Sequence, residues 1–263
     1  MEKEQATGIL SPADLDALGE ILNISMGASA TAISTMLDKQ VTITTPHLEI
    51  QKSSDVDYSD IEPALIVKIK YVEGLHGTNV MLFRSRDMHI ILNLLMGNDD
   101  ISGIPDDIAE FDEMGISAAC EVTNQMMGSA ATALSELLGE AVNISTPEAF
   151  VSTEMNSIQK TIHDVEPGTD VVSISFDLGI NGVINTNFAS LMPINFAKEI
   201  VDRLMGDQAA LAQENSENQA AAAAAAAAAA PVPAESAPAP APASAAAPAP
   251  APQQPGMEVA SSQ

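Results

Sequence analysis

Two stretches of the chain carry their apolar and small residues at the spacing of one face of an α-helix. With Leu15 set at zero and 100° added per residue, one set falls in a single stripe: Leu15, Leu18, Leu22, Ser25, Ser29, Ile33 and Met36. The second stretch has a matching set: Ile116, Ala119, Thr123, Met126, Ala130, Leu134 and Leu137. The pattern predicts two long helices, each with this stripe buried.

The second stretch is a copy of the first. EILNISMGASATAIS, which begins at Glu20, returns as EVTNQMMGSAATALS, which begins at Glu121 and so lies 101 residues later. The match continues from VTITTP at Val41 to VNISTP at Val142. Each copy then has two β-rich runs and a helix-like segment that ends in LMG. The chain is therefore predicted to contain two copies of one structural unit.

Each copy is predicted to hold a long helix, three strands and a closing helix. Glycine turns at Gly74–Gly77 and Gly179–Gly182 favour largely antiparallel pairing. Two such copies, each with one apolar sheet face, most simply merge into one α/β domain with pseudo-two-fold symmetry. We expect this domain to span residues 1–208, with its copies at about 10–98 and 111–207.

Residues 209–263 differ sharply from the rest of the chain. Alanine and proline dominate this segment, which includes a run of eleven alanines at Ala220–Ala230. Such a composition buries little apolar surface, so it cannot offset the entropy lost on ordering the chain. We expect a disordered linker or tail here.

Composition excludes several classes of partner and site. The net charge is −26 with only ten Lys and Arg, which argues against binding to nucleic acid or to an anionic membrane surface. No apolar run reaches the ~18 residues of a membrane-spanning helix, and the start does not resemble a signal peptide. The four histidines lack ligand spacing, so no metal site is expected. The single cysteine, Cys120, suits the reducing cytoplasm.

Polar residues and glycine recur on the side of each helix that faces away from the apolar stripe. On the first helix these are Asp16, Glu20, Asn23, Gly27 and Ser34. On the second they are Ser117, Glu121, Asn124, Gly128 and Ser135. A solvated surface is one explanation, but Asn and Gly each cost about 0.5–1 kcal/mol in a helix relative to Ala. A second explanation is that the glycines let another helix of the same fold cross closely.

The chemistry of this strip suits a third explanation. The sequence shows no Ser-His-Asp or Cys-His arrangement and no phosphate-binding glycine loop. A neutral carboxamide such as that of Asn23 or Asn124 can donate to and accept from water without repelling a phosphoryl anion. A carboxylate one turn earlier, at Glu20 or Glu121, can pair with a cation on a partner. This combination favours a helix that presents water to a phosphoryl group held by another protein.

The spacing of these residues resembles the signature of the CheC/CheX/FliY phosphatases of bacterial chemotaxis. It reads Asp16-x3-Glu20-x2-Asn23-x22-Pro46 in the first copy and Ser117-x3-Glu121-x2-Asn124-x22-Pro147 in the second. The run from about residue 10 to 207 is similar to the CheC-like middle domain of the FliY members.

The resemblance implies an enzyme that hydrolyses the phospho-aspartate of the response regulator CheY, in chemotaxis and flagellar motor switching. Asn23 and Asn124 would orient the water, and Glu20 and Glu121 would engage a lysine of the regulator. The neighbouring positions, namely Asp16, Gly27, Ser117 and Gly128, would contact the partner. Mg²⁺ would come from the regulator, so the chain is expected to need no cofactor of its own.

A non-catalytic function remains open at this point: a flagellar switch or adaptor protein that binds the phosphorylated regulator through the same faces. FliY members usually carry a separate regulator-binding peptide before this domain and a FliN-like domain after the linker. Here LSPADLDALGEIL runs directly into the first helix, so a separate peptide is not expected. The sequence stops at EVASSQ after the linker, which leaves two alternatives open: a truncated or split form, or a soluble CheC-like phosphatase. The resemblance implies a cytoplasmic protein, free or at the cytoplasmic face of the flagellar basal body.

Overall fold

The computed structural model describes residues 10–152 and 169–206. The chain divides into two units, Met1–Asn215 and Ser216–Gln263, and every described residue belongs to the first. The tail predicted for residues 209–263 lies outside the described residues. Residues 153–168, between two strands of the second copy, lie outside them as well.

Two long helices form where the apolar stripes predict them. Helix α2 spans Pro12–Leu37, and helix α4 spans Glu113–Leu138. A capping box starts α2, because the Ser11 hydroxyl accepts from the Asp14 N–H while the Asp14 carboxylate accepts from the Ser11 N–H. Asp112 caps α4 by accepting from the N–H of Gly115 at 2.6 Å. The expected pair of long helices is confirmed.

The buried stripe is wider than the predicted one. Within the first helix Leu18, Leu22, Ser25, Ser29 and Ile33 are buried as predicted, whereas Leu15 and Met36 are only half-buried. Further buried positions lie on both sides of the stripe: Ile21, Met26, Ala30 and Leu37. The helix is buried over this broader arc because it packs on a sheet and on a second helix at once.

Each copy contributes four strands to the described residues, one more than predicted. The first copy has β1 (Val41–Ile43), β2 (His47–Lys52), β3 (Ala64–Glu73) and β4 (Gly77–Arg84), then helix α3 (Ser85–Leu95). The second has β5 (Asn143–Ile144), β6 (Glu148–Ser152), β7 (Asp170–Ile180) and β8 (Ile184–Pro193), then a helix over residues 194–206. The predicted first strand is divided near Pro46 and Pro147, which have no N–H to donate to a strand ladder.

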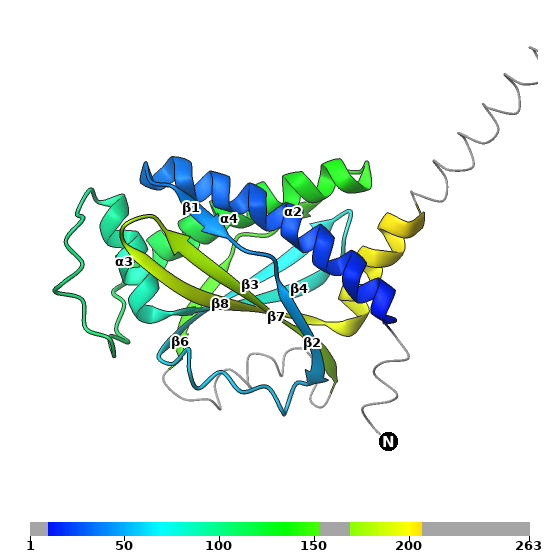
Figure 1. Cartoon of the computed structure of the whole chain (residues 1–263), viewed down its shortest axis with the longest axis horizontal. Helices are drawn as coiled ribbons and strands as arrows, with labels where there is room; N and C mark the ends of the chain where they lie inside the picture. Colours follow the sequence, from blue (N-terminus) through cyan, green and yellow to red (C-terminus); the bar gives the residue numbers. More distant parts are fainter. Residues whose placement is uncertain (1–9, 153–168, 207–263) are drawn as a thin grey trace, which may run out of the picture. The chain divides into compact units, whose positions relative to one another are not determined.

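The eight strands of the described residues form one antiparallel sheet, in which the copies exchange strands. The order is β1-β7-β8-β4-β3-β5, with β2 also paired to β7 and β6 to β3 (Figure 1). Thus β1 and β2 of the first copy pair with the second copy, and β5 and β6 pair with the first. The predicted merger into one pseudo-symmetric antiparallel domain is confirmed, and neither copy forms a complete sheet alone.

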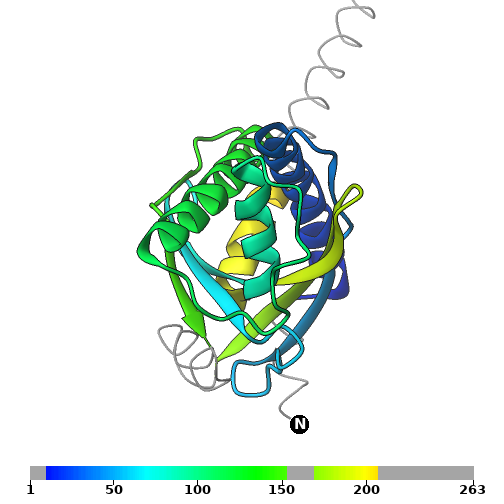
Figure 2. The ribbon, with the colours of Figure 1, turned by 90° about the vertical axis from the view of Figure 1, so that its left-hand side faces the viewer.

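The helices and the sheet enclose the larger of two cores. Helices α2 and α4 cover one face of the sheet, and α3 and the 194–206 helix close opposite ends of the same core (Figures 1 and 2). Rings of Phe83, Phe188 and Phe176 stack within it, with centroids 5.2 and 5.0 Å apart. A smaller core on the other sheet face is covered by the segment containing Val56 and Tyr58.

Helices α2 and α4 are fastened to each other by a reciprocal pair of hydrogen bonds. The Ser29 hydroxyl donates to the carbonyl of Met126 at 2.8 Å, and the Ser129 hydroxyl donates to the carbonyl of Ala28 at 3.0 Å. Small side chains at these positions let the two backbones come close enough for a hydroxyl to reach across. The crossing point is therefore at the middle of both helices.

The serines of the repeated phrase hold the strand that follows each helix. The Ser34 hydroxyl accepts from the Val41 N–H at 2.9 Å and donates to the Ala30 carbonyl. The Ser135 hydroxyl accepts from the Val142 N–H at 2.8 Å. The prediction that Ser34 and Ser135 belong to the solvent-facing strip is wrong, since both hydroxyls are engaged by their own helix and by the strand that follows it.

Replacing Ser34 or Ser135 with Ala should lower the free energy of unfolding by about 1–3 kcal/mol, because the strand N–H loses its acceptor in a poorly solvated place. Urea unfolding followed by far-UV circular dichroism measures the change. Thr35→Ala is the matched control, because the Thr35 hydroxyl is exposed and donates to its own helix at Thr31. Equal stability of Ser34→Ala and Thr35→Ala would contradict the assignment.

Candidate functional site

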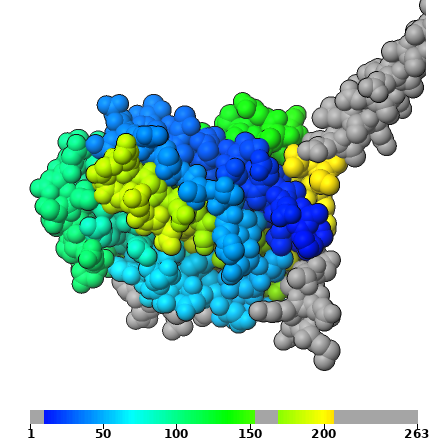
Figure 3. All heavy atoms as spheres, viewed as in Figure 1, coloured from blue at the N-terminus to red at the C-terminus, as the bar shows by residue number. Residues whose placement is uncertain are grey.

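The repeated polar residues lie on the outer faces of α2 and α4, away from the sheet. On α2, Asp16, Glu20 and Gly27 are exposed and Asn23 is half-buried. On α4, Ser117 and Glu121 are exposed, whereas Asn124 and Gly128 are half-buried. Figure 3 shows α2 at the surface along its length, with the end of α4 beside it. The structure thus forms two separate surface faces and does not bring the two copies together in one pocket.

Both asparagine amides are free to bind water or a ligand. Neither the Asn23 nor the Asn124 side chain has a hydrogen-bond partner among residues 10–152 and 169–206. Helical geometry fixes the backbone beneath them, and their half-buried position limits the rotamers that they can adopt. Each amide therefore offers a donor and an acceptor from a nearly fixed place.

The two glutamates have different surroundings. Glu121 accepts a hydrogen bond from the Nε2 of Gln125, one turn later, at 2.7 Å. The equivalent position on α2 is Ile24, which cannot donate, and Glu20 has no hydrogen-bond or ion-pair partner in the described part of the chain. Both carboxylates are exposed and lie within reach of a cation on a partner.

The glycines of the two faces do not serve packing within the fold. A Cβ built on Gly27 or Gly128 meets no atom of another element within 4 Å. The α2–α4 crossing instead uses Ser29 and Ser129. The structure therefore excludes the explanation that these glycines accommodate a crossing helix. They leave an open notch one turn beyond each asparagine, where a partner can approach the helix backbone closely.

The last residue of the signature, which is a proline in both copies, has a structural role. Pro46 and Pro147 lie between the two short strands that follow each long helix, and Pro147 is buried. Their position explains a signature that extends 23 residues past each asparagine: it combines an outer helix face with the strand break that follows the helix.

The described residues contain no group of three or more His, Cys, Asp or Glu side chains that could hold a metal ion. His89 has a structural environment: its ring stacks on Phe111 with centroids 4.0 Å apart, and its Nε2 is 3.0 Å from the Glu110 carbonyl oxygen. Burial lowers the pKa of His89. The His89 ring therefore packs on the segment that connects α3 to α4 and has a structural role.

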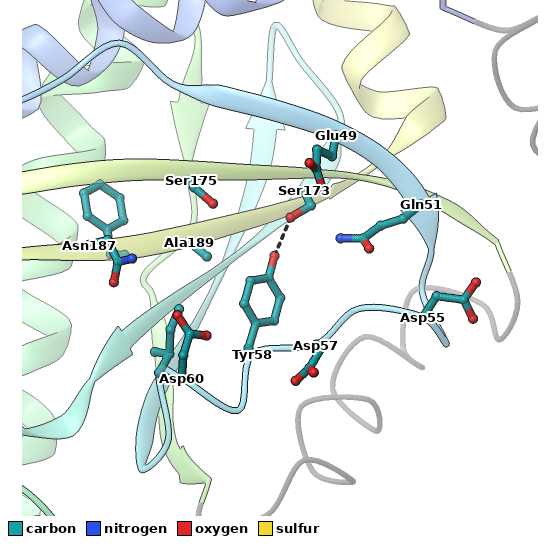
Figure 4. Close-up of a pocket in the computed structure, with 12 residues that line it drawn as sticks. Glu49, Gln51, Asp55, Asp57, Tyr58, Asp60, Ser173, Ser175, Asn187 and Ala189 are labelled. Atoms are coloured by element: carbon teal, nitrogen blue, oxygen red, sulfur yellow. Dashed lines mark hydrogen bonds between the residues drawn. The ribbon is translucent and has the colours of Figure 1, made fainter.

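An acidic pocket of about 260 Å³ lies on the opposite face of the sheet, and sequence analysis did not predict it. Glu49, Asp55, Asp57 and Asp60 line it, and the Tyr58 hydroxyl lies 2.7 Å from that of Ser173 (Figure 4). Burial raises the pKa of Tyr58 to about 12. A phosphoryl anion would be repelled from this lining. The acidic run SSDVDYSD is visible in the sequence, but the position of this run against the sheet face depends on strand pairing.

A second hollow, of about 610 Å³, lies between the end of α3 and the start of α4. Met96 and Met114, which are 75% and 79% exposed, lie on its rim. The two methionines are 18 residues apart in the sequence and belong to different elements, so no local pattern links them.

The chain matches a known family in both copies. The model of the CheC-like family matches residues 14–50 and 114–151, which contain the glutamate, asparagine and glycine of each outward face. The flagellar motor switch phosphatase FliY of Bacillus subtilis is 35% identical over 212 residues, which are 78% of this chain and 53% of that protein. The chain thus spans about half the length of this curated relative.

Solved structures support the match. The crystal structure of Thermotoga maritima FliY has a TM-score of 0.68 and 34% identity, covering 75% of this chain and 98% of that one. The FliM middle domain of H. pylori shares the fold at 12% identity, with a TM-score of 0.55 over 74% of this chain and 99% of that one.

None of the described helices is both long enough and apolar enough to cross a membrane.

The family motif is present twice, and the solved FliY relative is matched over almost its whole length. The chain therefore belongs to the CheC-like family of CheC, CheX and FliY proteins.

Proposed function

We propose that this chain is a phosphatase that hydrolyses the phospho-aspartate of the chemotaxis response regulator CheY, and so acts in chemotaxis and flagellar motor switching. The observation that carries the proposal is the pair of unpartnered, half-buried amides, Asn23 and Asn124, on outward helix faces. Each amide follows a carboxylate by three residues and precedes an open glycine by four. The name of the Bacillus subtilis relative, a motor switch phosphatase, supports the same reaction class.

In the proposed reaction each asparagine positions the attacking water. The amide oxygen accepts a hydrogen bond from the water, and the water oxygen then points toward the phosphorus. The new P–O bond forms as the bond from phosphorus to the aspartyl oxygen breaks, which yields inorganic phosphate and a free aspartate carboxylate. The proton released by the water passes to phosphate or to solvent. Positioning supplies most of the acceleration in such phosphoryl transfers.

An amide suits this position better than a carboxylate does. The transferred phosphoryl group is anionic, and the chain already carries a net charge of −26. A carboxylate at residue 23 or 124 would repel the phosphoryl group, whereas the neutral amide orients water at no electrostatic cost. The leaving aspartate is a good leaving group, so no general acid is required and none is placed there.

Glu20 and Glu121 dock the regulator in this proposal, each through a lysine of the receiver domain. Mg²⁺ belongs to the regulator and offsets the phosphoryl charge when the complex forms. The chain then acts in the cytoplasm, free or at the cytoplasmic face of the flagellar basal body. The alternative is an adaptor that binds the phosphorylated regulator through the same faces without hydrolysing it.

Replacing Asn23 and Asn124 together with Ala should abolish the acceleration of phosphate release from a phosphorylated CheY-type regulator. Each single change should leave part of the activity, because the faces are separate and need not cooperate. Release of inorganic phosphate, measured with and without the protein, tests this. Thr35→Ala combined with Glu136→Ala is the control, at equivalent exposed positions about 18 Å along each helix from the asparagine.

The double asparagine variant should keep the circular dichroism spectrum and unfolding midpoint of the wild type, since neither amide bonds to the fold. Hydrolysis by this variant at the wild-type rate would reject the water-positioning role. If neither the wild type nor the variant accelerated hydrolysis, and both still bound the regulator, the adaptor alternative would be favoured.

Replacing Gly27 and Gly128 with Ala should separate stability from activity. Each change should raise the free energy of unfolding by about 0.5–1 kcal/mol, because Ala favours helix and the new methyl group meets no neighbour. Turnover should fall at the same time, because the methyl group occupies the notch where the regulator approaches. A variant that is more stable and equally active would show that nothing binds in the notch.

Replacing Glu20 and Glu121 with Gln should weaken the complex at every pH and reduce its sensitivity to salt. An ion pair near the surface is screened over a Debye length of ~8 Å at physiological ionic strength, whereas an amide contact is not. Turnover measured from low to high salt shows the difference, and Glu136→Gln on α4 is the matched control. A wild-type pH profile that is bell-shaped, and flattened by these changes, would instead indicate proton transfer by the glutamates.

A further inference from the structure

The two outward faces share their asparagine, glutamate and glycine but differ at two positions. We define the α2 face as Asp16, Glu20, Asn23, Ile24 and Gly27, and the α4 face as Ser117, Glu121, Asn124, Gln125 and Gly128. The differences are Asp16 against Ser117 and Ile24 against Gln125. Because the rest of each face is repeated, these two pairs decide whether a partner meets equivalent surfaces.

Ile24 is an exposed apolar side chain next to the reacting amide. Its side chain is 42% exposed, although α2 buries its other large aliphatic residues wholly or in part. On a helix surface its neighbours are Glu20, one turn before, and Gly27, one turn after. It therefore lies beside the carboxylate and the open notch, where a docked protein would cover it.

The charges of the two faces differ as well. The α2 face has two exposed carboxylates, Asp16 and Glu20. On the α4 face the hydroxyl of Ser117 donates to its own helix at Glu113, and the one carboxylate, that of Glu121, is already held by Gln125 at 2.7 Å. A cation that docks on the α4 face shares the Glu121 carboxylate with this amide, which already holds one of its oxygens, whereas both oxygens of Glu20 are free within the described part of the chain.

We propose, on the basis of the proposed function, that the faces are unequal and that the α2 face is the tighter docking site for the regulator. Ile24 is its specificity-determining residue, and it receives an apolar side chain of a partner surface that places a cation beside it. The α4 face, with Gln125 in that position, binds the same surface more weakly. Asn23 and Asn124 perform the same chemistry on both faces.

The size of the effect follows from the exposed part of the side chain. Full burial of an Ile side chain stabilises by about 1.5–3 kcal/mol. Docking buries the 42% of Ile24 that is exposed in the free chain, and this part corresponds to about a two- to tenfold change in affinity. Exchange of the two residues should therefore change binding and KM by about this factor and leave kcat nearly unchanged, because neither residue touches the water.

Binding is tested by titrating the full chain with a CheY-type receiver domain held in its active form by beryllofluoride and Mg²⁺. Wild type should show a tight and a weak site. Ile24→Gln should weaken the tight site about two- to tenfold, and Gln125→Ile should strengthen the weak one. Met205→Gln is the control, since Met205 is also exposed on a helix but lies outside both faces.

Kinetics assign each site to its face. Asn124→Ala leaves hydrolysis to the α2 face and Asn23→Ala leaves it to the α4 face, so the first protein should have the lower KM. Adding Ile24→Gln to the first should raise KM, and adding Gln125→Ile to the second should lower it. Equal sites, or an Ile24→Gln variant with unchanged binding and KM, would overturn the inference.

The binding arm separates the two proposals. Phosphate release by both single-face proteins with no response to either exchange would overturn the inequality and leave the phosphatase standing. A chain that releases no phosphate but binds at two unequal sites, with the tight one weakened by Ile24→Gln, would reject the phosphatase and uphold the docking face. A chain that does not bind the receiver at all would overturn both.

Discussion

The crossing of α2 and α4 sets the geometry on which both faces depend. Ser29 donates to the Met126 carbonyl and Ser129 donates to the Ala28 carbonyl, so each helix holds the other by a hydroxyl near its own middle. Because the contact uses small side chains, the helix backbones lie close and cannot roll without breaking both bonds. The opposite sides of the helices, with Asn23 and Asn124, are thereby fixed toward solvent.

The exchanged strands make this geometry a property of the whole domain. Strands β1 and β2 leave α2 and pair with β7 of the other copy, while β5 and β6 leave α4 and pair with β3. Each long helix is therefore anchored at its C-terminal end to the half to which it does not belong in sequence. If one copy were present alone, the strands that follow its long helix would have no strand to pair with, and the helix would pack on an incomplete sheet.

The two outward faces carry their polar groups on open helix surfaces. The helices supply neutral amides, exposed carboxylates and an open notch, and the described residues supply no metal cluster. In the proposed reaction the regulator supplies the phosphoryl group and the cation that offsets its charge, so the two proteins complete the site together. Both faces lie on the outer sides of helices, while the acidic pocket of about 260 Å³ lies on the other side of the sheet.

Much of this arrangement could be predicted from the sequence, because helix periodicity is local and a repeat is found by comparing the chain with itself. The two long helices, the duplication, and the outward direction of Glu20, Asn23 and their counterparts follow from those two patterns. Other features depend on contacts between residues far apart in sequence, which no local pattern specifies. Strand exchange is one of them.

The tertiary structure alone decided what each outward residue meets. Ser34 has nearly the same angle on the helical wheel as Asn23, yet it binds the Val41 N–H, because the chain folds back beside the end of α2. Gly27 is a residue type that permits a close helix crossing, yet α2 and α4 cross at Ser29, and a Cβ on Gly27 would meet no neighbour. An angle on a wheel gives a direction, whereas the role of a side chain depends on the atoms that folding places there.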